Sequence, residues 1–92
     1  GTYTFHTRDG LDLHLNDWPA AQPRARMLIV HGLGEHSGRY TALAGDLTAL
    51  GISVRAFDHR GHGRSQGKRS AVGKDPDCLS RDAVEVFNAY AG

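Results

Sequence analysis

Residues 27 to 40 read MLIVHGLGEHSGRY, four apolar side chains followed directly by a glycine-rich turn. A run that is apolar at every position is typical of a parallel strand covered on both faces, so residues 27 to 30 are expected near the middle of a sheet. In open α/β sheets, ligands lie against the turns at the carboxyl ends of such strands. The stretch therefore predicts an α/β fold with a functional turn after this strand.

The residues that follow complete a β-α-β unit. Apolar side chains recur at helical spacing from Arg39 to Leu50, and Gly51 is a usual helix stop. Residues 52 to 58, ISVRAFD, then predict a second strand. Residues 59 to 74 are rich in glycine and basic side chains and are expected to form a long loop.

Two further elements flank this unit. Residues 2 to 7 and 11 to 18 alternate between apolar and polar side chains around an Asp9-Gly10 turn, which predicts an antiparallel hairpin. At the other end, Asp75-Pro76 supplies an N-cap and a first-turn proline for a second helix. The apolar face of this helix consists of Leu79, Ala83, Val86, Phe87 and Tyr90.

The predicted elements do not complete a sheet. A crossover helix normally returns the chain to the sheet, and no strand is predicted after the last helix. The apolar strand at residues 27 to 30 also needs a neighbour on each side. We therefore expect residues 1 to 92 to be the N-terminal segment of a single α/β domain, whose remainder is absent from this chain.

The composition argues against several classes of function. Eleven Lys and Arg against ten Asp and Glu give a formal net charge of +1, so no overall field favours nucleic acid. No apolar run approaches the roughly 20 residues that span a bilayer, and the N-terminus lacks the pattern of a signal peptide. Cys78 is the single cysteine, which excludes an internal disulfide and a cysteine-built zinc site. We expect a cytoplasmic protein, with peripheral membrane contact left open.

Two motifs at the predicted strand ends carry a family resemblance. HGLGEHSGRY occupies residues 31 to 40 after the first strand, and FDHRGHGRSQGKR occupies residues 57 to 69 at the end of the next. In this order and spacing they resemble the monoacylglycerol lipase and lysophospholipase group of the α/β-hydrolase fold. The resemblance covers essentially all 92 residues. It implies the N-terminal part of that sheet: an antiparallel hairpin, a parallel β-α-β unit and a helix.

The turn after the first strand is the candidate catalytic element. Ester hydrolysis passes through a tetrahedral oxyanion, which backbone N–H groups fixed in advance stabilise strongly. The resemblance implies that the backbone N–H of Leu33 is one such donor. Gly32 and Gly34 allow the backbone to approach the substrate closely, and His31 is assigned to bracing the turn. A glycine-rich turn with a purely structural role is the alternative.

A second motif has the sequence pattern of a catalytic serine. Residues 63 to 67, GRSQG, fit the G-x-S-x-G pattern of a serine nucleophile elbow. An elbow needs its serine at a sharp turn between an apolar strand and a helix, whereas Ser65 lies far from both predicted neighbours. The sequence therefore predicts a structural role for Ser65. The resemblance implies that the catalytic serine, acid and histidine all lie beyond residue 92.

Two other kinds of ligand are weighed for the loops. A metal site is one, built from His31, His36, His59 and His62. A glycine-rich loop gives these histidines no common face, so we favour loop hydrogen bonding and no metal. The segment GRSQGKRS fails the phosphate-loop pattern, because His62 and Arg69 replace its glycine and its hydroxyl residue. The basic side chains are interpreted as solvated surface: Arg60, Arg64, Lys68, Arg69 and Lys74.

The predicted function is a carboxylic ester hydrolase resembling monoacylglycerol lipases, represented by its N-terminal segment. By resemblance, a serine activated by histidine forms an acyl-enzyme that water releases, without a metal or an organic cofactor. The partners are then a small-molecule ester or lipid and the C-terminal remainder of the same protein, and this segment alone is expected to be inactive. The alternative is a non-catalytic product, either a truncated or nicked piece or a small binding module on the same scaffold.

Overall fold

The computed structural model describes residues 1 to 32 and 36 to 91. They form a four-stranded sheet in the order β1-β2-β4-β3. The strands are β1 (Thr2–His6), β2 (Asp12–Trp18), β3 (Ala25–Val30) and β4 (Ile52–Phe57). The helices are a 3-10 turn, η1 (Ser37–Tyr40), followed by α1 (Thr41–Ala49), α2 (Arg69–Lys74) and α3 (Asp77–Ala91). The prediction of an α/β fold is confirmed.

The two N-terminal strands form the predicted antiparallel hairpin. Thr2 pairs with Asn16 and His6 pairs with Asp12. Gly10 lies in the turn with a φ of 93°, a left-handed conformation that favours glycine. Every second residue of β2 points to the same face, and the buried members of that face are Leu13 and Leu15. The alternating pattern thus predicted both the pairing and the buried side.

The β-α-β unit is also confirmed. β3 and β4 pair in parallel, from Ala25 opposite Ile52 to Val30 opposite Phe57, and α1 connects them along the chain. Gly51 has a φ of 86° where α1 gives way to β4. On its other side β4 pairs with β2 in antiparallel orientation. β4 is therefore the strand that joins the hairpin to the β-α-β unit.

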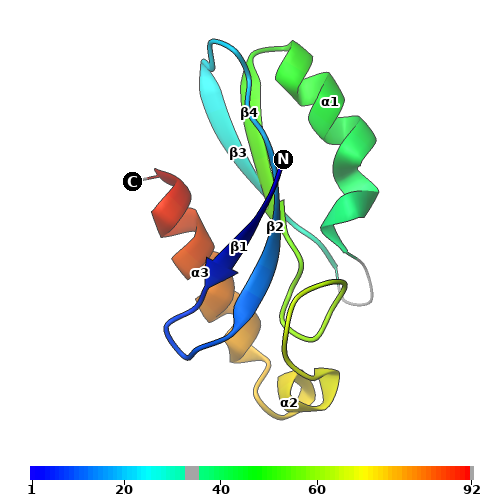
Figure 1. Ribbon diagram of the computed structural model, residues 1–92, viewed down its shortest axis with the longest axis vertical. Helices are drawn as coiled ribbons and strands as arrows, with labels where there is room; N and C mark the ends of the chain where they lie inside the picture. Colours follow the sequence, from blue (N-terminus) through cyan, green and yellow to red (C-terminus); the bar gives the residue numbers. More distant parts are fainter. Residues whose placement is uncertain (33–35, 92) are drawn as a thin grey trace.

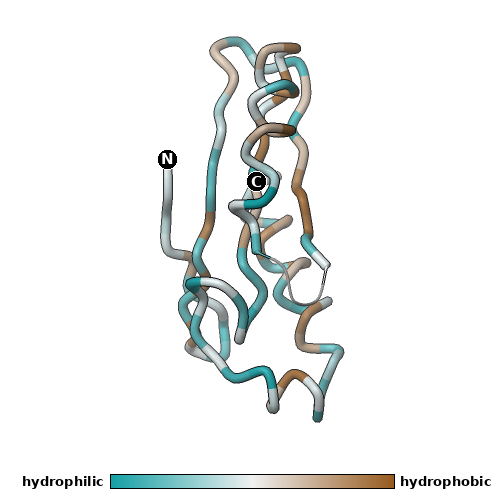
Figure 2. The backbone as a smooth tube through the Cα atoms, turned by 90° about the vertical axis from the view of Figure 1, so that its right-hand side faces the viewer, coloured by the Kyte–Doolittle hydropathy of each residue, from teal (hydrophilic) through white to brown (hydrophobic). Residues whose placement is uncertain are grey.

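Helices cover both faces of the sheet. Figure 1 shows α1 on one side of the strands and α3 on the other. The main apolar cluster lies between α3 and the sheet and consists of Leu13, Leu15, Phe57 and Val86. Figure 2 gives the narrow profile of this arrangement, whose extents are 40 × 25 × 18 Å. The buried apolar cluster between these layers is small.

The apolar strand has one open side among the described residues, as the predicted elements imply, and its central position stays a prediction for the complete domain. β3 lies at the edge of the sheet, and among the described residues only β4 pairs with it. Met27 and Val30 remain 40% and 47% exposed. The reason is the strand order: β4 takes β2 as its second neighbour, and the described chain provides no further strand for β3.

The segment after β4 differs from the predicted long loop. Residues 69 to 74 form the short helix α2, in which Val72 is buried. A helix of six residues, one of which is Gly73, carries too little periodic signal to be recognised from sequence. The loop that remains between β4 and α2 is correspondingly compact.

The helix boundaries also differ slightly from the prediction. α1 begins at Thr41, after a 3-10 turn, and α3 begins at Asp77, just beyond the predicted cap. Asp75 instead accepts a hydrogen bond from Arg81 at 2.7 Å. Phe87, which was expected on the apolar face of α3, is 55% exposed. In the described part of the chain no helix, α3 included, has the length and apolar character needed to cross a membrane.

Candidate active site

The turns after β3 and β4 lie at the same edge of the sheet. Val30 and Phe57 are the last residues of the two strands and are paired in parallel register. His31 and Asp58 follow them directly, and both are buried. The carboxyl edge of a parallel pair is where open α/β sheets bind their ligands.

His31 and His59 connect the two turns by a reciprocal pair of hydrogen bonds. The backbone N–H of His59 donates to Nε2 of His31 at 2.9 Å, and Nε2 of His59 lies 2.9 Å from the carbonyl oxygen of His31. Because Nε2 of His31 accepts, its Nδ1 carries the proton and donates to the carbonyl oxygen of Gly32 at 2.6 Å. The pairing thus requires His31 in a single neutral tautomer.

Burial lowers the pKa of His59 below its usual value, and the neighbouring His31 lowers it further. Nδ1 of His59 is buried and has no hydrogen-bond partner among the described groups. A proton on this atom would put a positive charge in dry surroundings beside a second imidazole. His59 therefore stays neutral and keeps its Nε2 proton for the carbonyl oxygen of His31.

His62 packs against this pair of histidines. The centroid of its ring lies 5.5 Å from that of His31 and 5.9 Å from that of His59. Within residues 1 to 32 and 36 to 91, no three His, Cys, Asp or Glu side chains are placed to share a metal ion. What holds these rings together here is ring packing and hydrogen bonding to the backbone.

Asp58 makes the second connection between the two turns. It is 3% exposed, and its Oδ1 accepts the backbone N–H and the hydroxyl of Ser37 at 2.6 and 2.7 Å. Oδ2 accepts the backbone N–H of Arg64 at 2.9 Å. Burial alone would raise the pKa of Asp58, but the hydrogen bonds from Arg64 and Ser37 bring it below the usual value. Asp58 is therefore an ionised carboxylate with both oxygens satisfied.

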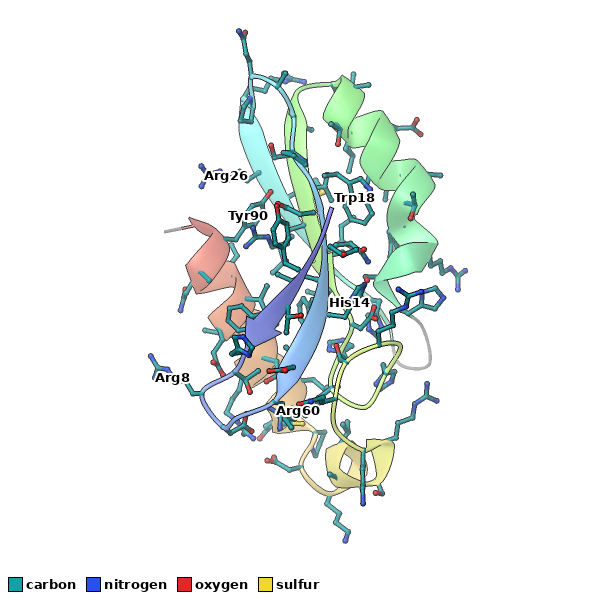
Figure 3. All side chains as sticks on the ribbon, in the orientation of Figure 1. Arg8, His14, Trp18, Arg26, Arg60 and Tyr90 are labelled. Carbon is teal, nitrogen blue, oxygen red and sulfur yellow. The ribbon has the colours of Figure 1, made fainter. Side chains whose placement is uncertain are left out.

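Strand β2 reaches the same turn through polar side chains. Nδ2 of Asn16 donates to the hydroxyl oxygen of Ser37 at 2.6 Å. An open pocket of about 410 Å³ lies beside this contact, and its walls include His14, Asn16, His36 and Arg64. His14, labelled on β2 in Figure 3, lines this pocket together with Ser37. Ser37 is thus bonded both to Asn16 of β2 and to Asp58, the residue directly after β4.

Ser65 does not lie in a nucleophile elbow. β4 ends at Phe57 and α2 begins at Arg69, so Ser65 lies in the interior of a loop. Its hydroxyl donates to the carbonyl oxygen of Asp58 at 2.5 Å and accepts the backbone N–H of His14 at 2.8 Å. Since the hydroxyl is engaged by two backbone groups, the structure agrees with the structural role predicted from the sequence.

Gly63→Ala should lower the free energy of unfolding of the complete protein by about 2 kcal/mol or more. Gly63 has a φ of 51°, a left-handed conformation in which a side chain costs about 1 to 2 kcal/mol. A Cβ at this position would also overlap the carboxylate of Asp58. Chemical denaturation measures the loss.

Gly45→Ala is the matched control for this substitution. Gly45 lies within α1, and a Cβ there would meet nothing within 4 Å. Alanine should stabilise the helix by about 0.5 to 1 kcal/mol. Equal stability of the two alanine variants would contradict the close packing described between Gly63 and Asp58.

Arg60 ties the loop after β4 to the rest of the fold. Its guanidinium forms a bidentate ion pair with Asp82 of α3, at 2.8 Å from Nε to Oδ2 and 2.7 Å from Nη2 to Oδ1. It also donates to both carboxylate oxygens of Asp9 in the hairpin turn, at 2.8 and 3.1 Å. Figure 3 shows Arg60 where the hairpin and α3 meet. The interpretation of Arg60 as solvated surface is therefore wrong.

The contacts around Arg60 shift the pKa values of Arg60 and Asp9 toward their charged forms. Hydrogen bonds from Arg60 and from the hydroxyl of Thr7 lower the pKa of Asp9 to about 2. The carboxylates of Asp82 and Asp9 raise the pKa of Arg60 above its usual value. Asp9 and Arg60 are therefore charged at neutral pH, and the contacts of Arg60 fix the loop after β4 to the hairpin and to α3 at one point.

The predicted oxyanion turn is described only in part. His31 is buried and contacts Gly32, whereas Leu33 and Gly34 lie outside the described residues. Sequence reasoning missed Asp58 and Ser37. A signal for Asp58 was present, because an acidic residue directly after an apolar strand is buried at the carboxyl edge of the sheet and needs donors there.

Solved structures define the class of protein. An esterase from Exiguobacterium antarcticum has a TM-score of 0.77 at 24% identity, over 99% of this chain and 32% of the esterase. A soluble variant of monoglyceride lipase from Saccharomyces cerevisiae, in complex with a substrate analog, has a TM-score of 0.65 at 29% identity. That match covers 71% of this chain and 21% of the lipase. The fold is that of the α/β hydrolases, as the sequence predicted.

Sequence relatives define the family. The family model described as "Serine aminopeptidase, S33" matches residues 21–91, and the chain belongs to this family of hydrolases. Monoglyceride lipase of Homo sapiens is 48% identical over 78 residues, which are 84% of this chain and 25% of that protein. A monoglyceride lipase homolog of Monkeypox virus is 42% identical over 77 residues, covering 80% of this chain and 28% of the viral protein. The chain spans about a quarter of the length of these two relatives. The resemblance to monoacylglycerol lipases is confirmed.

Proposed function

We propose that this chain is part of a carboxylic ester hydrolase that cleaves monoacylglycerol-type lipid esters with a serine nucleophile. The observation that carries this function is the 48% identity to the monoglyceride lipase of Homo sapiens over 84% of the chain. The two turns at one sheet edge support it, because α/β folds bind ligands there. The partner is a small lipid ester, no cofactor takes part, and the enzyme works in the cytoplasm with peripheral contact to lipid.

The proposed contribution of residues 1 to 92 to the chemistry is one oxyanion donor. The backbone N–H of Leu33 donates to the tetrahedral oxyanion, on a turn shaped by His31, Gly32 and Gly34. The nucleophilic serine, the acid and the histidine lie outside these residues. The histidine takes the proton of the serine as the serine attacks the ester carbonyl and then gives it to the leaving alcohol. Water releases the acid in the second half of the reaction.

Ser65→Ala should leave ester turnover of the complete protein within a few-fold of the parent, because among the described residues the Ser65 hydroxyl bonds two backbone groups. A fluorophosphonate probe should label a serine outside residues 1 to 92, which mass spectrometry of the labelled peptide identifies. Labelling of Ser65, together with loss of turnover in the alanine variant, would assign the nucleophile to this loop instead.

We further propose that residues 1 to 92 are the N-terminal segment of a single α/β-hydrolase domain. On this basis the isolated 92-residue chain should associate instead of melting as a two-state monomer. β3 offers an unpaired edge flanked by the exposed side chains of Met27 and Val30, and such edges recruit other strands. Sedimentation and thermal melts at several protein concentrations measure this. A monomeric species with a cooperative, concentration-independent melt would count against the single-domain proposal.

A non-catalytic product is the second candidate. One observation favours it: Protein K6 of Vaccinia virus (strain Western Reserve) is 48% identical over 54 residues, and these residues already make up 67% of that protein. A relative of that size has little room for a complete hydrolase domain. Mass spectrometry of the intact natural protein separates the two candidates, because the enzyme requires a polypeptide that extends well past residue 92.

A further inference from the structure

We propose that Asp58 is a positioning residue for ester hydrolysis. Its carboxylate holds Ser37, and with it the far end of the segment that carries the oxyanion donor, against the carboxyl end of β4. Because Leu33 is the proposed donor, this role of Asp58 rests on the proposed function. Asp58 itself contacts neither substrate nor nucleophile in this assignment.

The contact between Asp58 and Ser37 has the features of a rigid attachment. One carboxylate oxygen accepts both the N–H and the hydroxyl of Ser37, at 2.6 and 2.7 Å. Hydrogen bonds to an ionised acceptor are shorter and about twice as strong as neutral ones. Asp58 is 3% and Ser37 is 1% exposed, so water does not compete for these groups. The backbone position of Ser37 is therefore set by the carboxylate.

The loop after β4 folds around this carboxylate. The N–H of Arg64 occupies Oδ2, and Gly63 lies so close to it that a side chain would overlap. The hydroxyl of Ser65 bonds the carbonyl oxygen of Asp58 and thereby connects it to the N–H of His14 on β2. In the GRSQG motif, Gly63 thus allows the close approach to Asp58, the N–H of Arg64 bonds its side chain, and Ser65 bonds its backbone. The motif therefore has a structural role around Asp58 that does not require Ser65 to be a nucleophile.

The start of the donor segment is attached separately. His31 precedes the segment and is bonded in both directions to His59, the residue next to Asp58. His31 and Ser37, the described residues on either side of the donor segment, are thus bonded to two residues that are consecutive in the chain, His59 and Asp58. A change at Asp58 should release only the end of the segment and leave the His31 attachment in place.

Asp58→Asn in the complete protein tests this role. The amide supplies an NH₂ group where a carboxylate oxygen accepted an N–H from either Arg64 or Ser37, so one of these contacts is lost in each orientation. A shift of about 1 Å in a catalytic group costs on the order of 10²-fold in rate. We expect kcat for a p-nitrophenyl ester to fall by about 10- to 100-fold, with KM within about threefold of the parent.

A transition-state probe separates positioning from general damage. An alkyl trifluoromethyl ketone adds the catalytic serine and forms an oxyanion like that of the reaction, so its affinity reports the donor geometry. In Asp58→Asn its affinity should fall by the same factor as kcat, whereas the KM for the ester stays near the parent value. Loss of affinity for ester and ketone by equal factors would indicate general damage and would overturn the assignment.

Asp82→Asn is the matched control. Asp82 is an equally buried carboxylate that also bonds the loop after β4, through Arg60, but on the side of α3. It should lower the melting temperature while leaving kcat within about threefold of the parent, measured well below the melting temperature of each variant. A fall in kcat equal to that of Asp58→Asn would show that any weakening of this loop slows the enzyme, and the specific role would be wrong.

Ser37→Ala decides the matter if Asp58→Asn does not fold. It removes the hydroxyl but keeps the backbone N–H on Asp58, so kcat should fall by about three- to tenfold with KM unchanged. A folded Ser37→Ala or Asp58→Asn enzyme with parental kcat overturns the positioning role alone. A parent protein that neither turns over esters nor reacts with a fluorophosphonate overturns the proposed function instead.

Discussion

Leu33→Pro should lower the kcat of the complete enzyme for ester hydrolysis by about 10²- to 10³-fold, which corresponds to about 2.7 to 4 kcal/mol of transition-state stabilisation. Proline has no backbone N–H, so the substitution deletes the proposed oxyanion donor itself. The binding of the substrate ester depends much less on this group, because the oxygen is an anion only in the transition state. Steady-state kinetics with an activated ester measures the effect.

Leu33→Ala is the control, because it keeps the N–H and removes only the side chain. Its rate should change modestly, through repacking of the site. The comparison applies when Leu33→Pro melts near the parent temperature and is still acylated slowly by the activated ester, since proline also restricts the backbone. A stably folded Leu33→Pro enzyme with near-normal kcat would leave the HGLG turn with a structural role only.

Arg60→Met should lower the free energy of unfolding of the complete protein by about 3 to 5 kcal/mol. Asp82 is 0% exposed, and the substitution leaves its charge buried without the guanidinium that now binds both of its oxygens. Asp9 has a side chain that is 54% exposed and can regain water, so Asp9→Asn should cost less than about 1 kcal/mol. Chemical denaturation of the three proteins gives the comparison.

The double variant Arg60→Met/Asp82→Leu tests whether the loss of stability in Arg60→Met comes from the unpaired buried charge of Asp82. With both charges gone, apolar side chains of similar size fill the same space, and most of the stability should return. If the double variant is as unstable as Arg60→Met, the cost arises from lost packing around the side chain at position 60 and not from the buried charge of Asp82.

Local patterns predicted most of the fold. The hairpin and the β-α-β unit were recognised because their signals, alternation in residues 11 to 18 and helical spacing after Arg39, lie within each segment. The missing neighbour of β3 was expected from its apolar sequence. The order of the four strands was not predicted, because it depends on pairing between segments that lie far apart in the chain. The short helix α2 was missed because six residues carry little periodicity.

The candidate site was predicted only where a motif marks it. The HGLG turn was selected from its glycines and its position after an apolar strand, and its catalytic role stays a prediction. The contacts around the two turns join residues far apart in sequence. Ser37 and Asp58 are 21 positions apart, and Asp9 and Arg60, which attach the loop after β4 to the hairpin, are 51 apart. No pattern within one segment predicts such pairs. Arg60 was consequently interpreted as a solvated surface side chain.

The strand order also has a consequence for synthesis on the ribosome. β3 follows β2 in the chain, but β2 pairs with β4. The edge of β2 that faces away from β1 therefore stays unpaired until β4 has been synthesised as far as Phe57. Translation proceeds at about 5 to 20 residues per second, so the 39 residues from Trp18 to Phe57 keep this edge unpaired for roughly 2 to 8 s. During that interval the sheet of the nascent chain lacks β4. Chaperone binding to the unpaired edge of the hairpin should be strongest during this time.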